Sequence, residues 1–195
     1  MKINPLELRG NWTKGYALDY HTISSEYLGE DEYGHAQFDT RRSDIGELLY
    51  QFKYKNNYSK LNEIIELITP FIEQFTLCNP VDVIIPVPPS NTNRKYQPVY
   101  ELSKAIGDII NKSVAYDFLS KCNNTQLKGL GIEEKKNAIS GSVIRNKCFL
   151  VKRNVLIIDD LYQTGTTLNE ISNLLKEEEA NINNIYVITM TKTRR

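Results

Sequence analysis

The sequence predicts an α/β fold in which a mostly parallel sheet carries helices on both faces, with a small N-terminal appendage. Short apolar, β-branched runs such as 81–87 and 155–158 are typical of buried strands. Segments such as 99–110 and 165–178 place apolar residues at helical spacing. Strand and helix alternate through the last two-thirds of the chain, and this order favours a parallel sheet joined by helical crossovers. Ligands of such sheets bind at the carboxyl ends of the strands, so a site is expected at the loops after Val87 and Ile158.

The composition indicates an ordinary globular chain of 195 residues, with 41% apolar and 25% charged residues. That length suits one compact domain with a real core. Lysine plus arginine balances aspartate plus glutamate, so the formal net charge is zero and nucleic acid is not indicated. The N-terminus lacks the apolar run of a signal peptide, and no stretch approaches the roughly 20 apolar residues of a membrane helix. We therefore expect a cytoplasmic protein without a membrane partner.

Cysteine and histidine usage argues against a zinc site or a disulfide framework. Cys78, Cys122 and Cys148 are far apart and form no C-x-x-C pair, and the chain has only two histidines, His21 and His35. We expect three reduced and mostly buried thiols. We interpret His21 as a hydrogen-bonded structural residue and His35 as part of a turn.

Residues 1–42 are predicted to form an N-terminal appendage or hood, and residues 43–195 the main domain. The appendage holds Trp12, several tyrosines and turn signals, which favour short strands or hairpin pieces. The domain begins with two helical segments, 43–52 and 58–75, and Pro70 is a candidate break in the second.

The rest of the domain is predicted from apolar runs and from the polar segments between them. Residues 121–137 are polar, lysine-rich and glycine-bearing, which is typical of a long mobile loop, and the final TKTRR is predicted to be an exposed tail. The expected strands are 81–87, 114–119, 148–151, 155–158 and 185–190, and the expected helices are 99–110 and 165–178.

The segment VLIIDDLYQTGTT, residues 155–167, carries the strongest functional signal. Asp159 and Asp160 follow an apolar strand, and the next loop opens a helix at Gly165. Glycine permits a tight turn and a close approach of backbone to ligand, and the unpaired N–H groups of a helix start suit a phosphate. Carboxylates suit the hydroxyls of an attached sugar. The segment therefore predicts a sugar-phosphate site, with the phosphate on Gln163, Thr164, Gly165, Thr166 and Thr167.

This segment resembles the phosphoribosyl pyrophosphate (PRPP) motif of the type I phosphoribosyltransferases. Over residues 43–192 the chain is most similar to the ComF-like branch, which includes amidophosphoribosyltransferase-like and competence proteins. Three further matches support the resemblance. The Pro-Val-Pro segment after residue 85 leads to Arg94, Tyr96 and Gln97, the helix in 46–61 ends in Lys-Tyr, and a variable loop spans 125–137.

The chain departs from the family pattern in three places. The zinc-binding N-terminus that is common in the ComF-like branch is absent. Gln163 stands where that branch often has threonine and purine-specific relatives have aspartate, and an amide cannot act as a general base. Lys95 replaces the glycine that follows the family's arginine.

The resemblance implies a transferase that binds PRPP and passes its phosphoribosyl group to a small acceptor, such as a nucleobase, with Mg²⁺ neutralising the leaving pyrophosphate. Asp159 and Asp160 would hold the ribose hydroxyls, with Mg²⁺ contact through them as an option. Arg94 would act at the pyrophosphate as a catalytic residue. Further candidates for binding pyrophosphate are Lys95, Lys128, Lys135 and Lys136.

Plainer readings remain beside these. The aspartates could cap a helix, and Arg94 and Lys95 could be surface charges. The fold also serves proteins that sense PRPP or nucleotides without turnover, and ComF-like proteins are linked to DNA uptake. A third alternative for this chain is an effector of a bacterial defence or toxin cassette that consumes PRPP or modifies nucleotides. Type I relatives are often dimers, which favours a homodimer by resemblance.

Overall fold

A computed structural model describes residues 1–91, 93–121 and 143–194. A six-stranded sheet with the order β1-β2-β10-β9-β5-β6 forms its centre. All neighbouring pairs are parallel except β1 and β2. The strands are β1 (Leu6–Glu7), β2 (Lys14–Tyr20), β5 (Val83–Pro86), β6 (Ser113–Val114), β9 (Arg153–Tyr162) and β10 (Ile182–Lys192). The predicted fold class is therefore confirmed.

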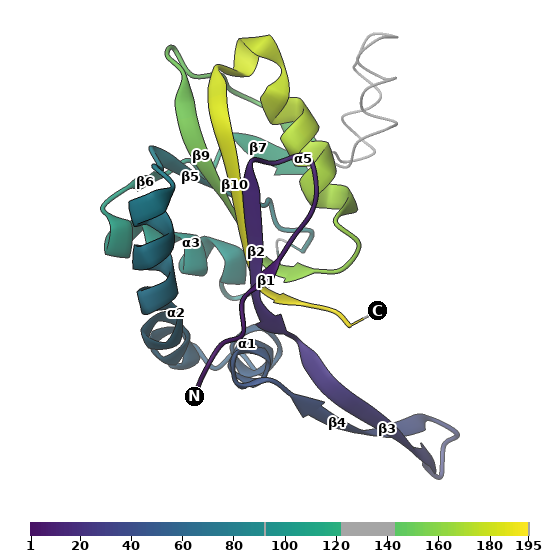
Figure 1. Cartoon of the computed structure of the whole chain (residues 1–195). Helices are drawn as coiled ribbons and strands as arrows, with labels where there is room; N and C mark the ends of the chain where they lie inside the picture. The colour runs from purple at the N-terminus through teal and green to yellow at the C-terminus, as the bar shows by residue number, and fades with distance from the viewer. Residues whose placement is uncertain (92, 122–142, 195) are drawn as a thin grey trace, which may run out of the picture.

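Helices cover both faces of the sheet (Figure 1). Helices α1 (Asp44–Tyr54), α2 (Lys60–Cys78) and α3 (Pro98–Ile110) pack on one face, where they bury Phe52, Ile68 and Leu102 against strand residues such as Ile158. Helix α5 (Thr166–Lys176) and the short 3-10 helix η2 (Glu178–Ala180) follow β9, and α5 packs its apolar residues on the opposite face. In each of these α-helices, apolar residues at helical spacing meet the sheet, because burying that stripe supplies most of a helix's stability.

Two smaller hairpins complete the fold. Strands β3 (Thr22–Glu30) and β4 (Ala36–Arg42) form an antiparallel pair that projects away from the sheet (Figure 1). We call residues 22–42 the arm. Strands β7 (Leu119–Lys121) and β8 (Val143–Arg145) form a second antiparallel pair beside α5.

The N-terminal 42 residues divide into two parts, which their sequence did not reveal. Strand β2 pairs in parallel with β10 inside the central sheet, and its Ala17 and Leu18 are fully buried. Trp12 is buried as well and donates its indole N–H to the carbonyl of Leu8. Only the arm lies outside the sheet, so the first 20 residues belong structurally with the domain that was predicted to begin at residue 43.

Several local predictions differ from the structure. Residues 148–151 form no strand, and Leu150 is 97% exposed. The strand in this part of the chain is β8, which lies a few residues earlier. Residues 114–119 yield the ends of two strands, β6 and β7, rather than one. Pro70 lies inside a continuous α2. Cys78 and Cys148 are exposed rather than buried, and Cys122 lies outside the described residues.

The C-terminal segment is part of the sheet and not a solvated tail. Thr191 is fully buried in β10. Lys192 accepts a hydrogen bond from the His21 amide through its carbonyl, and Thr193 donates its amide to the carbonyl of Tyr162. Arg194 is exposed but donates to the carbonyl of Ile23 at the start of the arm. These contacts tie the last residues to the ends of β2 and β9, because β10 lies between them.

Candidate functional site

The loops after β5 and β9 meet at the carboxyl edge of the sheet. The two strands are parallel neighbours, with Pro86 opposite Ile158, and the Val87 amide donates to the Ile158 carbonyl at 2.9 Å. The loops that follow Val87 and Ile158 therefore both begin at the carboxyl edge of the sheet. This is the arrangement expected from the sequence, since ligands bind at this edge in parallel sheets.

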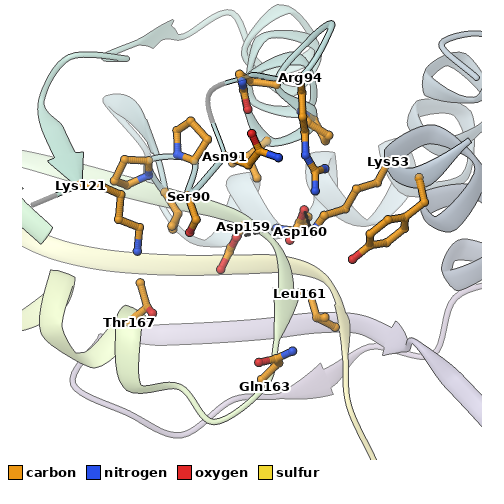
Figure 2. Close-up of a pocket in the computed structure, with 17 residues that line it drawn as sticks. Lys53, Ser90, Asn91, Arg94, Lys121, Asp159, Asp160, Leu161, Gln163 and Thr167 are labelled. Atoms are coloured by element: carbon orange, nitrogen blue, oxygen red, sulfur yellow. Dashed lines mark hydrogen bonds and ion pairs between the residues drawn. The ribbon is translucent and has the colours of Figure 1, made fainter. Parts of the chain in front are cut away.

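A cavity of about 290 Å³ lies between these two loops and the C-terminal end of α1 (Figure 2). Carboxylates and cations from four separate segments line it. The lining residues are Lys53, Tyr54, Val87, Pro88, Pro89, Ser90, Asn91, Arg94, Gln97, Pro98, Val99, Lys121, Asp159, Asp160, Leu161, Gln163 and Thr167.

The two aspartates at the end of β9 have different surroundings. Asp159 accepts the backbone amide of Asp160 at 2.8 Å. Burial, followed by the neighbouring charge of Asp160, raises the pKa of Asp159 to about 7, while Lys53 and Lys121 oppose the rise. Asp160 is 8% exposed and forms an ion pair with Lys53, with 2.5 Å between Nζ and Oδ2. Side chains alternate along a strand, so the two carboxylates face opposite sides.

Lys53 is one of the site residues that sequence reasoning did not assign, as are Lys121 and Tyr54. It stands in the last turn of α1, far from the motif, and extends toward Asp160 (Figure 2). The Lys53 side chain is only 16% exposed. The one sequence signal for it was the Lys-Tyr ending of this helix. That ending also brings Tyr54 to the cavity wall, where the Arg94 guanidinium lies 5.7 Å from the centre of the Tyr54 ring.

A smaller cavity of about 100 Å³ adjoins the first and follows the loop into α5. Gly165 adopts φ 80°, and a Cβ there would meet the Tyr162 hydroxyl at 2.5 Å. The Thr164 hydroxyl lies 2.8 Å from that of Thr166 and accepts the Thr166 amide at 3.3 Å. The remaining free N–H groups of a first helical turn favour an anion here. The lining residues are Asp159, Leu161, Tyr162, Gln163, Thr164, Gly165, Thr166, Thr167 and Leu168.

The predicted pyrophosphate residues separate in the structure. Arg94 lines the larger cavity and is half-buried. Lys95 is exposed and is absent from the lining of that cavity. Lys121, at the end of β7, lines the cavity instead, on the Asp159 side (Figure 2). Lys128, Lys135 and Lys136 lie outside the described residues.

His21 lies behind the site rather than in it, as its structural interpretation expects. Its Nδ1 is 3.2 Å from the Thr191 hydroxyl, which in turn donates to the Asp160 carbonyl at 3.3 Å. Burial, then the charges of Arg42 and Lys53, lower the pKa of His21 below its ordinary value. A neutral imidazole therefore supports the end of β9 through a hydroxyl.

Within the described part of the chain, no group of three or more histidine, cysteine, aspartate or glutamate residues is placed to hold a metal ion. Among the same residues, no helix is long and apolar enough to cross a membrane.

Comparisons with known proteins found similar folds and no sequence relative. No family model matches the chain. No curated protein matches it either. Among solved structures, adenine phosphoribosyltransferase from Leishmania tarentolae is 10% identical, with 97% of this chain and 94% of that chain covered and a TM-score of 0.45.

Two further structures show the same range of likeness. Adenine phosphoribosyltransferase from Trypanosoma brucei, in complex with AMP, pyrophosphate and ribose-5-phosphate, is 12% identical, with coverage of 98% and 87% and a TM-score of 0.43. A hypoxanthine phosphoribosyltransferase from Staphylococcus aureus is 20% identical, with coverage of 66% and 62% and a TM-score of 0.39. At identities and scores this low, the functional argument rests on the side chains of the site.

Proposed function

We propose that this protein binds PRPP at the carboxyl edge of its sheet and transfers the phosphoribosyl group to a small acceptor. The observation that carries the proposal is the pair of adjoining cavities, which share Asp159, Leu161, Gln163 and Thr167. One cavity offers helix-start amides and hydroxyls, and the other offers carboxylates beside cations. A sugar that bears a phosphate at one end and a pyrophosphate at the other matches that order of charges.

In this proposal the 5′-phosphate occupies the smaller cavity, on the loop 163–167. The ribose then lies over Asp159, which faces both cavities and accepts hydrogen bonds from the ribose hydroxyls once it is ionised. Arg94 and Lys121 meet the pyrophosphate from two sides of the larger cavity. Cations placed where the leaving group gains charge stabilise the transition state more than the ground state.

Lys53 has a positioning role in the same proposal. Its ion pair holds Asp160 beside the C-terminal end of α1. Asp160 is therefore engaged by the protein, and Asp159 is the carboxylate available to a ligand. The negative charge of the pair Asp159 and Asp160 still lies near the anomeric carbon, where positive charge develops as the bond to pyrophosphate breaks. Pyrophosphate leaves with the electrons of its bond to that carbon, the acceptor nitrogen donates its electron pair to form the new bond, and the proton of that nitrogen passes to water.

Mg²⁺ is part of this proposal through the substrate. The described residues provide two carboxylates at the site, and one of these is engaged by Lys53. This donor set is too small for a protein-made cage but fits an ion that is held largely by pyrophosphate oxygens and water, which is how Mg²⁺ is commonly bound. The ion would supply charge neutralisation of the leaving group, and Asp159 is the side chain placed to contact it.

The acceptor class is proposed from the cavity wall. Tyr54 presents an exposed aromatic face at this wall, and aromatic rings stack on flat heterocycles such as nucleobases. Gln163 can donate and accept hydrogen bonds to an acceptor but cannot remove its proton. The narrower resemblance to the ComF-like branch rests on the sequence motifs alone.

A second candidate is a protein that senses PRPP or a nucleotide without turnover. The outward position of Lys95 favours it, because among the described residues this leaves Arg94 and Lys121 as the cations that line the larger cavity beside the Lys53 ion pair. Fewer contacts to a leaving group suit binding better than transfer.

Isothermal titration with Mg²⁺-PRPP, compared with ribose 5-phosphate, tests the binding site. We expect tight binding that needs both Mg²⁺ and the pyrophosphate, and loss of that binding in Asp159→Asn. Asp108→Asn, an exposed carboxyl on α3, is the matched control and keeps wild-type affinity. Absence of PRPP binding to the wild-type protein contradicts the proposal. Pyrophosphate release with a panel of nucleobases then separates the transferase from the sensor.

A further inference from the structure

Most residues of the arm are exposed, and its two faces differ. Side chains alternate along each strand, so Tyr27 and its partner Phe38 share one face and Glu26 and its partner Asp39 share the other. The Tyr27 and Phe38 rings touch edge to face, with centroids 5.6 Å apart, yet the residues remain 58% and 56% exposed. Tyr33 at the tip is 78% exposed.

The arm is also strongly acidic. Residues 26–39 contain five carboxylates and no lysine or arginine, so in a chain with a formal net charge of zero the remainder carries +5. Glu26 lies directly opposite Asp39, and like charges in that position weaken a hairpin. A two-stranded hairpin in water is only marginally stable on its own, so these features favour an arm whose faces are covered by something else.

The base of the arm is held in place, which fixes the direction in which it projects. Ser43 donates its hydroxyl to the Tyr20 carbonyl and caps α1 by accepting the Gly46 amide at 3.0 Å. On the other strand, Arg194 donates to the Ile23 carbonyl. At the tip, Asp31 accepts the amides of Tyr33 and His35 at 2.9 Å each. The arm is thus a built element and not a loose loop.

We propose that the arm docks on the body of a second copy of this chain, and that two copies exchange arms about a two-fold axis. Contact between two arms would bring five carboxylates against five, whereas contact with the rest of a second chain joins opposite charges, because the arm carries −3 once Arg41 and Arg42 are counted and the remainder carries +3. Self-complementary contacts of this kind are the usual basis of a two-fold dimer. A standard interface uses about 20–30 residues a side, and the 14 residues of 26–39 plus a comparable receiving surface reach that size.

Sedimentation velocity of the full chain tests this proposal without any ligand. We expect a species of twice the 22.5 kDa chain mass at micromolar concentration. Because opposite charges hold the arm, raising the salt from about 0.05 M to about 0.5 M shortens the screening length and weakens the dimer at least tenfold. A chain that remains monomeric up to about 100 µM overturns the proposal.

Two independent arm variants locate the contact. Tyr27→Ser with Phe38→Ser removes the aromatic face, and Glu30→Lys with Glu32→Lys reverses charge at the tip while leaving that face intact. Each is expected to raise the dissociation constant at least tenfold, with circular dichroism unchanged because these side chains are exposed. Leu150→Ser, at an apolar residue outside the arm that is 97% exposed, is the control and leaves the dissociation constant unchanged. A dimer that survives both arm variants overturns the proposal.

Discussion

Two pairs of neighbouring carboxylates in this chain have opposite surroundings. Asp159 and Asp160 close the central strand β9, where protein encloses them and Lys53 pairs with one. Glu26 and Asp39 face each other across the arm, exposed on an element that lacks lysine and arginine from residue 26 to 39. Burial raises the pKa of Asp159 in the first pair, whereas water screens the charges of the second pair.

The contrast teaches where charge is costly in this fold. A buried like-charge pair needs a counter-ion, and α1 supplies it through Lys53. An exposed like-charge pair needs no counter-ion in the fold, but it favours the approach of a surface with opposite charge. The predictions below test each side of this contrast, from the largest expected effect to the smallest.

Lys53→Met should lower the unfolding free energy the most, because it removes the cation that pairs with Asp160. It leaves Asp160 enclosed without its cation, and removing one partner of a buried ion pair costs about 3 kcal/mol of unfolding free energy. We expect a matching fall in the midpoint of urea unfolding. Lys53→Arg retains the charge and should recover most of the loss. Equal stability of the Met variant and the wild type would show that the ion pair contributes nothing to the fold.

Asp159→Asn should separate binding from folding. We expect PRPP affinity to fall by roughly tenfold to a hundredfold, because hydrogen bonds to an ionised group are worth about 1.5–3 kcal/mol. The fold should stay intact, as judged by circular dichroism, since Asp159 faces the cavities. Asp160→Asn should behave differently and destabilise the chain, because it strands Lys53. Similar behaviour of the two variants would contradict the division of roles between them.

The raised pKa of Asp159 predicts opposite trends for stability and affinity with pH. The folded chain holds the Asp159 proton up to about pH 7, while an unfolded aspartate releases it near its ordinary pKa of 3.8. The contribution to stability is therefore full below the unfolded pKa and is lost as pH rises through about 7. PRPP affinity should rise over the same upper range, because the hydroxyls bind the ionised carboxylate.

Thermal unfolding and titration at pH 5 and pH 8 measure both trends. Asp159→Asn should gain stability relative to wild type at pH 8 by about 1 kcal/mol, a value reduced from the full pKa shift because the side chain opens onto the cavities. At pH 5 the two chains should differ less. A constant difference across this range would show that Asp159 does not titrate there.

Neutralising the exposed pair should have the smallest effect on folding. In Glu26→Gln with Asp39→Asn, we expect the unfolding free energy to change by less than about 0.5 kcal/mol when the chain is dilute enough to be monomeric, because surface substitutions rarely exceed that value. Urea unfolding at low protein concentration measures it. A loss as large as that of Lys53→Met would erase the contrast between the two pairs.

Much of the carboxyl-edge site could be predicted because its parts are local in sequence. The run of apolar residues before Asp159 and the glycine at 165 specify a strand, a turn and a helix start within 13 residues. The meeting of this segment with the loop after Val87 also followed, since parallel neighbouring strands end at one edge. Lys53 could not be assigned in this way, because its contact with Asp160 spans more than a hundred residues and depends on how α1 crosses the sheet.

The N-terminal region shows the same division. The aromatic and polar mixture before residue 43 indicated short strands, and β1 to β4 are such strands. Nothing in the residues 14–20 themselves distinguishes an appended strand from one in the central sheet, because the choice is made by the open edge of β10. Likewise the TKTRR ending has the composition of a tail, yet β10 extends through Lys192 because β2 and β9 lie on either side of it.

The sequence by itself determined the α/β class, the faces of the helices and the sugar-phosphate segment, since each depends on residue spacing within one element. Only the tertiary structure decided that Asp160 is paired and Asp159 faces the cavities, that β2 completes the sheet and that the arm projects from it. Those outcomes depend on which distant surfaces come into contact. Burial in the folded chain then raises the pKa of Asp159.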